Sequence, residues 1–167
     1  MAEIVLLKSV YKYPLFDVLV SMKLKEALKY FPELEGETVY VGVKRKTCLG
    51  EVCGAADPVN NIVFFNPHDP PSYVTVFHEL MHLVIAKLRR EGEKVPKTET
   101  YVSIAAIARM PSHLVDENRI PYVADKVPEH LTPKLPELCK KALEYRKHRR
   151  NYIQFLKKQL KVISNEG

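Results

Sequence analysis

Apolar residues in the first half of the chain follow two spacings, one typical of strands and one typical of helices. Three short runs rich in β-branched, aliphatic and aromatic side chains, residues 3–10, 38–43 and 60–66, predict strands. Residues 15–31 instead carry apolar side chains three and four positions apart, which predicts a helix. The apolar positions that define this helix are Leu15, Val18, Leu19, Met22, Ala27 and Leu28.

A longer helical pattern occupies residues 73–90 at the centre of the chain. Ser72 precedes this pattern and can cap the first turn, whereas residues 91–92 (Glu-Gly) can close the last turn. A second helix is predicted to begin near residues 97–98 and to end before Pro111. Short strands combined with these helices indicate an α+β fold.

Glycine and proline mark most of the remaining segments. Residues 47–58 contain two glycines and predict a loop or an irregular hairpin, and residues 111–133 contain four prolines and predict a packed loop. A rough apolar stripe over residues 137–163 predicts one long C-terminal helix. We therefore expect one domain over residues 1–133, with a basic helix over residues 134–167 that packs on this domain or extends it.

The central helix contains the pattern His78-Glu79-Leu80-Met81-His82, in which the two histidines are four positions apart. On a helix both imidazoles project from one face, and two neutral imidazoles at this separation can bind one zinc ion. Glu79 directly follows the first histidine, where its carboxylate can reach a water on the metal. Glu79 is the only charged residue among residues 75–84, and uncharged flanks are typical of the longer form of this signature.

A catalytic zinc site needs a third protein ligand and one open position. A histidine six residues beyond His82 is excluded because position 88 is leucine. Glu99 is the favoured third ligand, since a chain reversal through Gly92 and Pro96 could bring the second helix alongside the first. The other residues that remain open as the third ligand are His113, Asp116 and Glu117.

With this motif, residues 38–110 resemble the zincin metallopeptidases of the gluzincin type, and in size the minigluzincins. The resemblance implies a compact α+β zincin-like core: a small mixed sheet, the H-E-x-x-H helix and a following helix that carries the glutamate, with an N-terminal helix and a long C-terminal helix added. It implies zinc held by His78, His82 and Glu99, with Glu79 as general base. It also implies that an edge strand, here residues 60–66, lines the cleft and pairs with substrate. The chain departs from the family in a slightly short spacing from His82 to Glu99 and in serine at position 103.

The expected function is therefore that of a zinc-dependent peptidase, an endopeptidase that a covering segment could keep latent. Its expected partner is a peptide or protein substrate. A second hypothesis comes from charge: residues 134–167 hold ten Lys and Arg and three Glu, a net of +7, whereas the rest of the chain holds sixteen basic and seventeen acidic residues, a net of −1. Residues 140–158 could thus bind nucleic acid, either in a binding protein or in a protease that acts on nucleic-acid-bound proteins; the simpler alternative is a solvated helix face.

Composition indicates the class of protein and its expected cellular location. Hydrophobic residues make up 46% of the 167 residues and charged residues 28%, which is ordinary for a globular protein. No apolar run is long enough to span a bilayer, and no signal peptide is recognised, so we expect a cytoplasmic protein without a membrane partner. Three cysteines do not suggest a disulfide scaffold: Cys48 and Cys53 are expected to be incidental thiols, with a disulfide or metal ligation as alternatives, and Cys139 is expected in the core.

Overall fold

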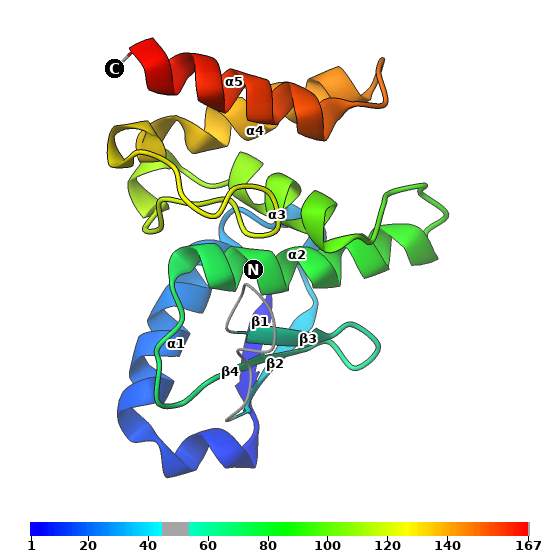
Figure 1. The fold of residues 1–167 in the computed structure, drawn as a ribbon. Helices are drawn as coiled ribbons and strands as arrows, with labels where there is room; N and C mark the ends of the chain where they lie inside the picture. The colour runs from blue at the N-terminus through cyan, green and yellow to red at the C-terminus, as the bar shows by residue number, and fades with distance from the viewer. Residues whose placement is uncertain (45–53, 167) are drawn as a thin grey trace. The chain divides into compact units, whose positions relative to one another are not determined.

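The computed structural model describes residues 1–44 and 54–166. By its internal contacts the chain divides into two units, Met1–Lys97 and Thr98–Gly167, which are shown together in Figure 1. The domain boundary expected between residues 133 and 134 falls inside the second unit, and as a division into domains it stays a prediction. Cys48, Cys53 and most of the expected loop over residues 47–58 lie outside the described residues.

The first unit contains a four-stranded mixed sheet in the order β1-β2-β4-β3. The strands are β1 (Glu3–Leu6), β2 (Thr38–Val43), β3 (Gly54–Asp57) and β4 (Ile62–Phe65). The first three strands in this order pair in parallel, whereas β3 pairs with β4 antiparallel. With the helices described below, this sheet confirms the predicted α+β class.

The strand predicted at the edge of the sheet is an interior strand, so that expectation was wrong. Residues 60–66 contain β4, which lies between β2 and β3, and the edge on this side is β3. The pattern of Gly54–Asp57 (Gly-Ala-Ala-Asp) gave no strand signal because glycine, alanine and aspartate are all depleted in strands. The turn that follows fixes the hairpin instead: the Asp57 carboxylate accepts hydrogen bonds from the backbone N–H groups of Val59 and Asn60.

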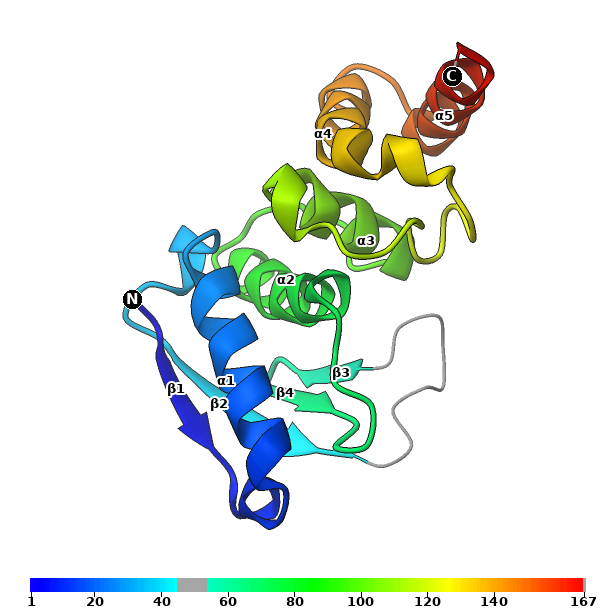
Figure 2. The ribbon, with the colours of Figure 1, turned by 90° about the vertical axis from the view of Figure 1, so that its left-hand side faces the viewer.

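Two helices cover one face of this sheet, α1 (Pro14–Leu28) and α2 (Tyr73–Arg90), as Figure 2 shows. The buried residues of β4 alternate along the strand, as expected where one face packs on helices; in β2 the buried Val39 and Val41 alternate in the same way, and Gly42 is also buried. Both predicted ends of α2 are confirmed: Ser72 Oγ accepts a hydrogen bond from the Thr75 N–H at 3.0 Å, and Gly92 follows the helix with φ of +92°. The buried hydrophobic residues of the sheet are Val39, Val41, Val63 and Phe65.

Helix α1 is apolar on two faces. Its inner face buries Phe16, Val20, Leu24, Ala27 and Leu28. Four of the residues whose spacing predicted the helix lie on the other face, where Leu15 is 82%, Val18 57%, Leu19 42% and Met22 64% exposed. The spacing thus correctly predicted a helix, but it could not show which apolar face meets the sheet.

The second unit consists of helices and their connections. It contains α3 (Glu99–Ala108), α4 (Leu135–Arg146) and α5 (Tyr152–Glu166), with short 3-10 helices at Ser112–Leu114 and Glu129–Lys134 in the long connection. Cys139 is fully buried on α4, as expected, and burial raises the pKa of its thiol. No helix in the described part of the chain has both the length and the apolar character needed to cross a membrane.

The single long helix predicted over residues 137–163 is wrong, because the chain turns between α4 and α5 and the two helices form an antiparallel hairpin (Figure 1). The turn coincides with residues 146–150, five consecutive basic residues that offer no apolar side chain for packing. Reversal lets the two apolar faces bury each other, and the rings of Tyr145 and Phe155 stack with centroids 4.3 Å apart. The residues buried on the two helices include Leu138, Ala142, Leu156 and Leu160.

Candidate metal centre

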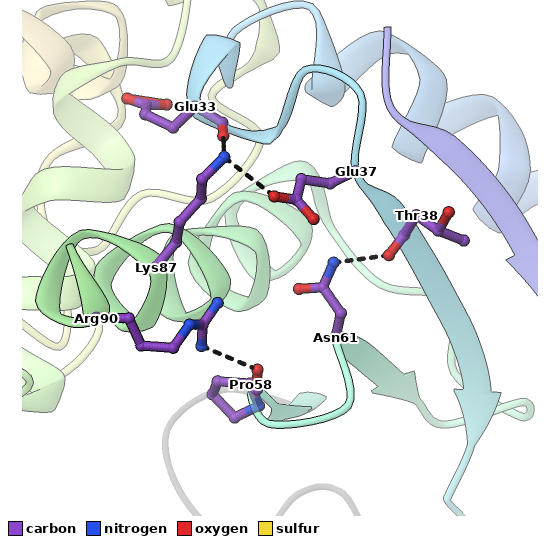
Figure 3. Close-up of polar contacts among 7 residues, drawn as sticks. All are labelled: Glu33, Glu37, Thr38, Pro58, Asn61, Lys87 and Arg90. Carbon is purple, nitrogen blue, oxygen red and sulfur yellow. Dashed lines mark hydrogen bonds and ion pairs between the residues drawn. The ribbon is translucent and has the colours of Figure 1, made fainter.

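Helix α2, which carries the two histidines, is anchored at both ends by polar contacts within the first unit. At its N-terminal end the Lys23 ammonium donates to the Pro71 carbonyl at 2.6 Å. Near its C-terminal end Lys87 donates to the Glu33 carbonyl at 2.6 Å and forms an ion pair with Glu37 at 3.1 Å (Figure 3). These contacts hold both ends of the helix within the first unit, and hence the position of the side chains at its middle.

The loop before β4 makes two further contacts in the same region. The Arg90 guanidinium donates to the Pro58 carbonyl at 3.5 Å, and the Asn61 amide donates to the Thr38 carbonyl at 2.6 Å (Figure 3). Asn61 has φ of +58°, a left-handed conformation that asparagine tolerates better than most residues. The β3–β4 hairpin is therefore tied both to the end of α2 and to β2.

His78 and His82 lie on one face of α2, as the sequence predicts. Their ring centroids are 5.0 Å apart and the rings are nearly perpendicular, at 74°. His78 is 2% exposed, and most of its neighbours on α2 are apolar and buried. Two imidazoles one helical turn apart can thus direct one nitrogen each toward a common point.

Glu79 is 3% exposed and lies directly against the backbone of β3. A Cβ atom placed on Gly54 would lie 2.9 Å from Glu79 Cγ and 3.1 Å from Glu79 Oε1, and 3.1 Å from a methyl carbon of Thr75. Only glycine leaves room for the strand and this side chain to approach so closely. Sequence reasoning did not identify Gly54 as part of the site, because the contact joins residues far apart in the chain.

The third predicted ligand also belongs to the group. One ligand atom each of His78, His82 and Glu99 can be chosen so that all three lie within 4.8 Å of one another. Two imidazole nitrogens and a carboxylate oxygen form a donor set that suits a catalytic zinc ion. Other divalent ions accept the same donors, so the group defines a candidate metal site and leaves the reaction open.

None of the alternative third ligands joins such a group within residues 1–44 and 54–166. His113 follows α3 in the 3-10 helix Ser112–Leu114. Glu117 forms an ion pair with the Arg119 guanidinium at 3.1 Å. Glu99 is thus the candidate that can complete a group of three with the two histidines among the described residues, and its role as the third ligand stays a prediction.

Comparison with known proteins adds no relative: no protein-family model matches the sequence, and no curated protein or solved structure is significantly similar to the chain. The resemblance to gluzincins therefore depends on the residues of the motif and on the geometry described above.

Proposed function

We propose that this protein is a zinc-dependent endopeptidase in which His78, His82 and Glu99 hold the metal and Glu79 is the general base. The observation that carries the proposal is the placement of Glu79. This carboxylate adjoins a metal-ligand residue on an anchored helix and is buried against the edge strand β3. A carboxylate that directly follows the first of two histidines on one helix face is placed where a general base can meet a metal-bound water.

Each residue has a distinct task in this proposal. When bound, zinc supplies Lewis-acid chemistry that lowers the pKa of a water molecule toward about 7. Glu79 accepts the proton of that water as the water attacks the peptide carbonyl carbon, and then donates the proton to the leaving amine. The anchored backbone of α2 and the close approach of β3 hold the Glu79 carboxylate in place, so that little reorganisation accompanies the proton transfer.

The edge strand suggests how a substrate is held. β3 pairs with β4 on one side and with no described strand on the other. An extended peptide can add to such an edge through main-chain hydrogen bonds, which would bring its carbonyl groups past Glu79. Ala55 and Ala56 carry only methyl side chains, which leave space for a substrate along this edge. The proposed substrate-binding strand is therefore β3 instead of residues 60–66.

A cytoplasmic location of the protein stays part of the proposal.

The direct test is cleavage of casein or gelatin by the full chain with zinc bound. We expect cleavage that 1,10-phenanthroline abolishes and added zinc restores, together with zinc coordination by three protein ligands and one open position in X-ray absorption spectra. Full zinc occupancy with four protein ligands and no cleavage of any protein substrate would instead identify a structural zinc and overturn the proposal.

Replacing Gly54 by alanine tests the role of the close strand. The added Cβ would collide with the buried Glu79 side chain, so we expect proteolysis to fall by about tenfold, and further for Gly54→Val, because small misplacements of a catalytic group cost up to about 10²-fold. Zinc content should not change, since neither variant alters a ligand. Val59→Ala, an exposed change in the turn of the same hairpin, is the control and should keep its activity. Equal activity of Gly54→Ala and wild type would contradict the positioning role.

A further inference from the structure

The turn between α4 and α5 forms a concentrated positive surface, here called the basic tip: Arg146, Lys147, His148, Arg149 and Arg150. Because the chain reverses here, these residues project from the end of a helical hairpin (Figure 1) instead of lying along one side of a long helix. The last four are exposed, and Arg146 is partly buried. A solvated outer helix face, the simpler alternative raised by the sequence, does not describe this arrangement.

The basic tip is held in a defined shape by aromatic contacts within the second unit. Tyr145 and Phe155 stack nearly in parallel, with 4° between their planes, across the base of the turn. The Arg146 guanidinium lies 5.2 Å from the ring centroid of Tyr101 and 5.8 Å from that of Tyr152. Cation–π contacts of this kind fix the first residue of the tip. The charges that follow are therefore presented from an ordered base.

Backbone hydrogen bonds continue this order through the turn. The N–H groups of His148 and Arg149 both donate to the Tyr145 carbonyl, at 3.1 and 2.9 Å, and the N–H of Phe155 donates to the Asn151 carbonyl at 3.0 Å. Less conformational freedom is then lost when a ligand binds, which favours binding by a preformed surface.

Few of these charges are neutralised by the protein itself. Lys147 pairs with Glu144 at 2.8 Å, an exposed pair, but no ion pair within the described residues involves Arg149, Arg150, Lys157 or Lys158. Residues 98–167 hold thirteen Lys and Arg and eight Asp and Glu, a net of +5, which is most of the chain's net charge of +6. The surface therefore has an excess of positively charged side chains that a polyanion can neutralise.

The positive surface continues from the tip along α4. A hollow of about 510 Å³ adjoins the tip, and basic side chains form much of its wall. The residues that line it are Tyr101, Lys140, Leu143, Glu144, Arg146 and Lys147. A partner that follows both the tip and this hollow needs an extended row of negative charges.

Three kinds of anionic partner are compared for the basic tip: a membrane surface, single-stranded nucleic acid and duplex DNA. A membrane-surface helix needs an apolar face to insert, but Tyr152, Leu156 and Leu160 are buried in the hairpin. Single-stranded nucleic acid would require free rings for base stacking, and the Tyr145 and Phe155 rings are stacked on each other. Arg and Lys side chains offer hydrogen-bond donors and no acceptors, which suits the phosphate oxygens that a DNA duplex presents along both strands. We propose that the basic tip binds the phosphate backbone of duplex DNA without reading its sequence.

The test is fluorescence anisotropy of a labelled 20-base-pair DNA duplex titrated with the full chain at several salt concentrations. We expect Arg149→Ala/Arg150→Ala to weaken binding at low salt by about tenfold or more, and to reduce the slope of log K against log salt by about 2, one for each lost phosphate contact. The matched control is Arg89→Ala/Arg90→Ala, another adjacent and exposed arginine pair, which removes the same charge from the first unit. This control should bind DNA as wild type does.

Several results would overturn the proposal. Equal loss in both double variants would show a net-charge effect, and wild-type binding by Arg149→Ala/Arg150→Ala would exclude the tip. Tighter binding to a single strand, to an RNA duplex of the same sequence or to anionic vesicles would reject duplex DNA as the partner. Arg149 and Arg150 lie outside the proposed metal centre and its supporting contacts, so Arg149→Ala/Arg150→Ala should still cleave casein, and the outcome does not depend on the proposed peptidase activity.

Discussion

Glu79→Gln is expected to reduce proteolysis by about a thousandfold while zinc remains bound, because general acid–base catalysis typically contributes about 10²–10⁴-fold. Glutamine has nearly the shape of glutamate, so it fits the buried space beside Gly54 without the collision that a larger residue would cause. It cannot accept the proton of the attacking water, however. The measurement is kcat on a casein-derived peptide, with zinc content determined by mass spectrometry and thermal unfolding recorded for both proteins.

A matched control lies just beyond the C-terminal end of the same helix. Glu91 follows the last residue of α2 and is exposed, so Glu91→Gln makes the same chemical change outside the metal centre and should leave kcat unchanged. If Glu79→Gln kept more than about a tenth of the activity, the general-base role would be wrong. If the variant lost zinc together with activity, Glu79 would be needed for zinc binding, and the loss of activity would not report on a general-base role.

The sequence predicts an element well where local signals agree. α2 begins and ends where expected because a serine cap, an apolar stripe and a closing glycine all mark the same helix. β2 is also predicted with its observed bounds, since its β-branched and aromatic residues stand between turn residues. The motif histidines follow from the helix alone, because positions four apart share one face.

The errors arise where contacts between distant residues decide the structure. β3 has the composition of a loop and becomes a strand because β4 provides a pairing partner. The α4–α5 turn interrupts an apolar stripe that continues in register through residues 137–163, and only the mutual burial of the two halves shows that the chain reverses. Gly54 could not be assigned to the site for the same reason: nothing near it in sequence indicates that Glu79 lies within 3 Å of a side chain placed there.

Zinc affinity should distinguish the third ligand among the candidates that the sequence left open. We expect the wild-type chain to bind about one zinc ion, and His82→Ala and Glu99→Ala to weaken binding by at least about a hundredfold, since loss of even an outer-shell partner costs about 10–100-fold. His113→Ala, Asp116→Ala and Glu117→Ala are matched controls, because these residues belong to no group of three metal-binding side chains within the described part of the chain. Their zinc affinity should equal that of wild type in competition with a chromophoric chelator.

The pattern across these variants separates two kinds of failure. If His113→Ala released zinc and Glu99→Ala did not, the third ligand would be wrong, whereas the two histidines on α2 and the proposed role of Glu79 would stand. If His82→Ala still bound one zinc ion as tightly as wild type, the metal would lie elsewhere in the protein. The peptidase proposal would then fail, because the 5.0 Å pairing of the His78 and His82 rings beside the buried Glu79 is the geometry from which the proposed chemistry follows.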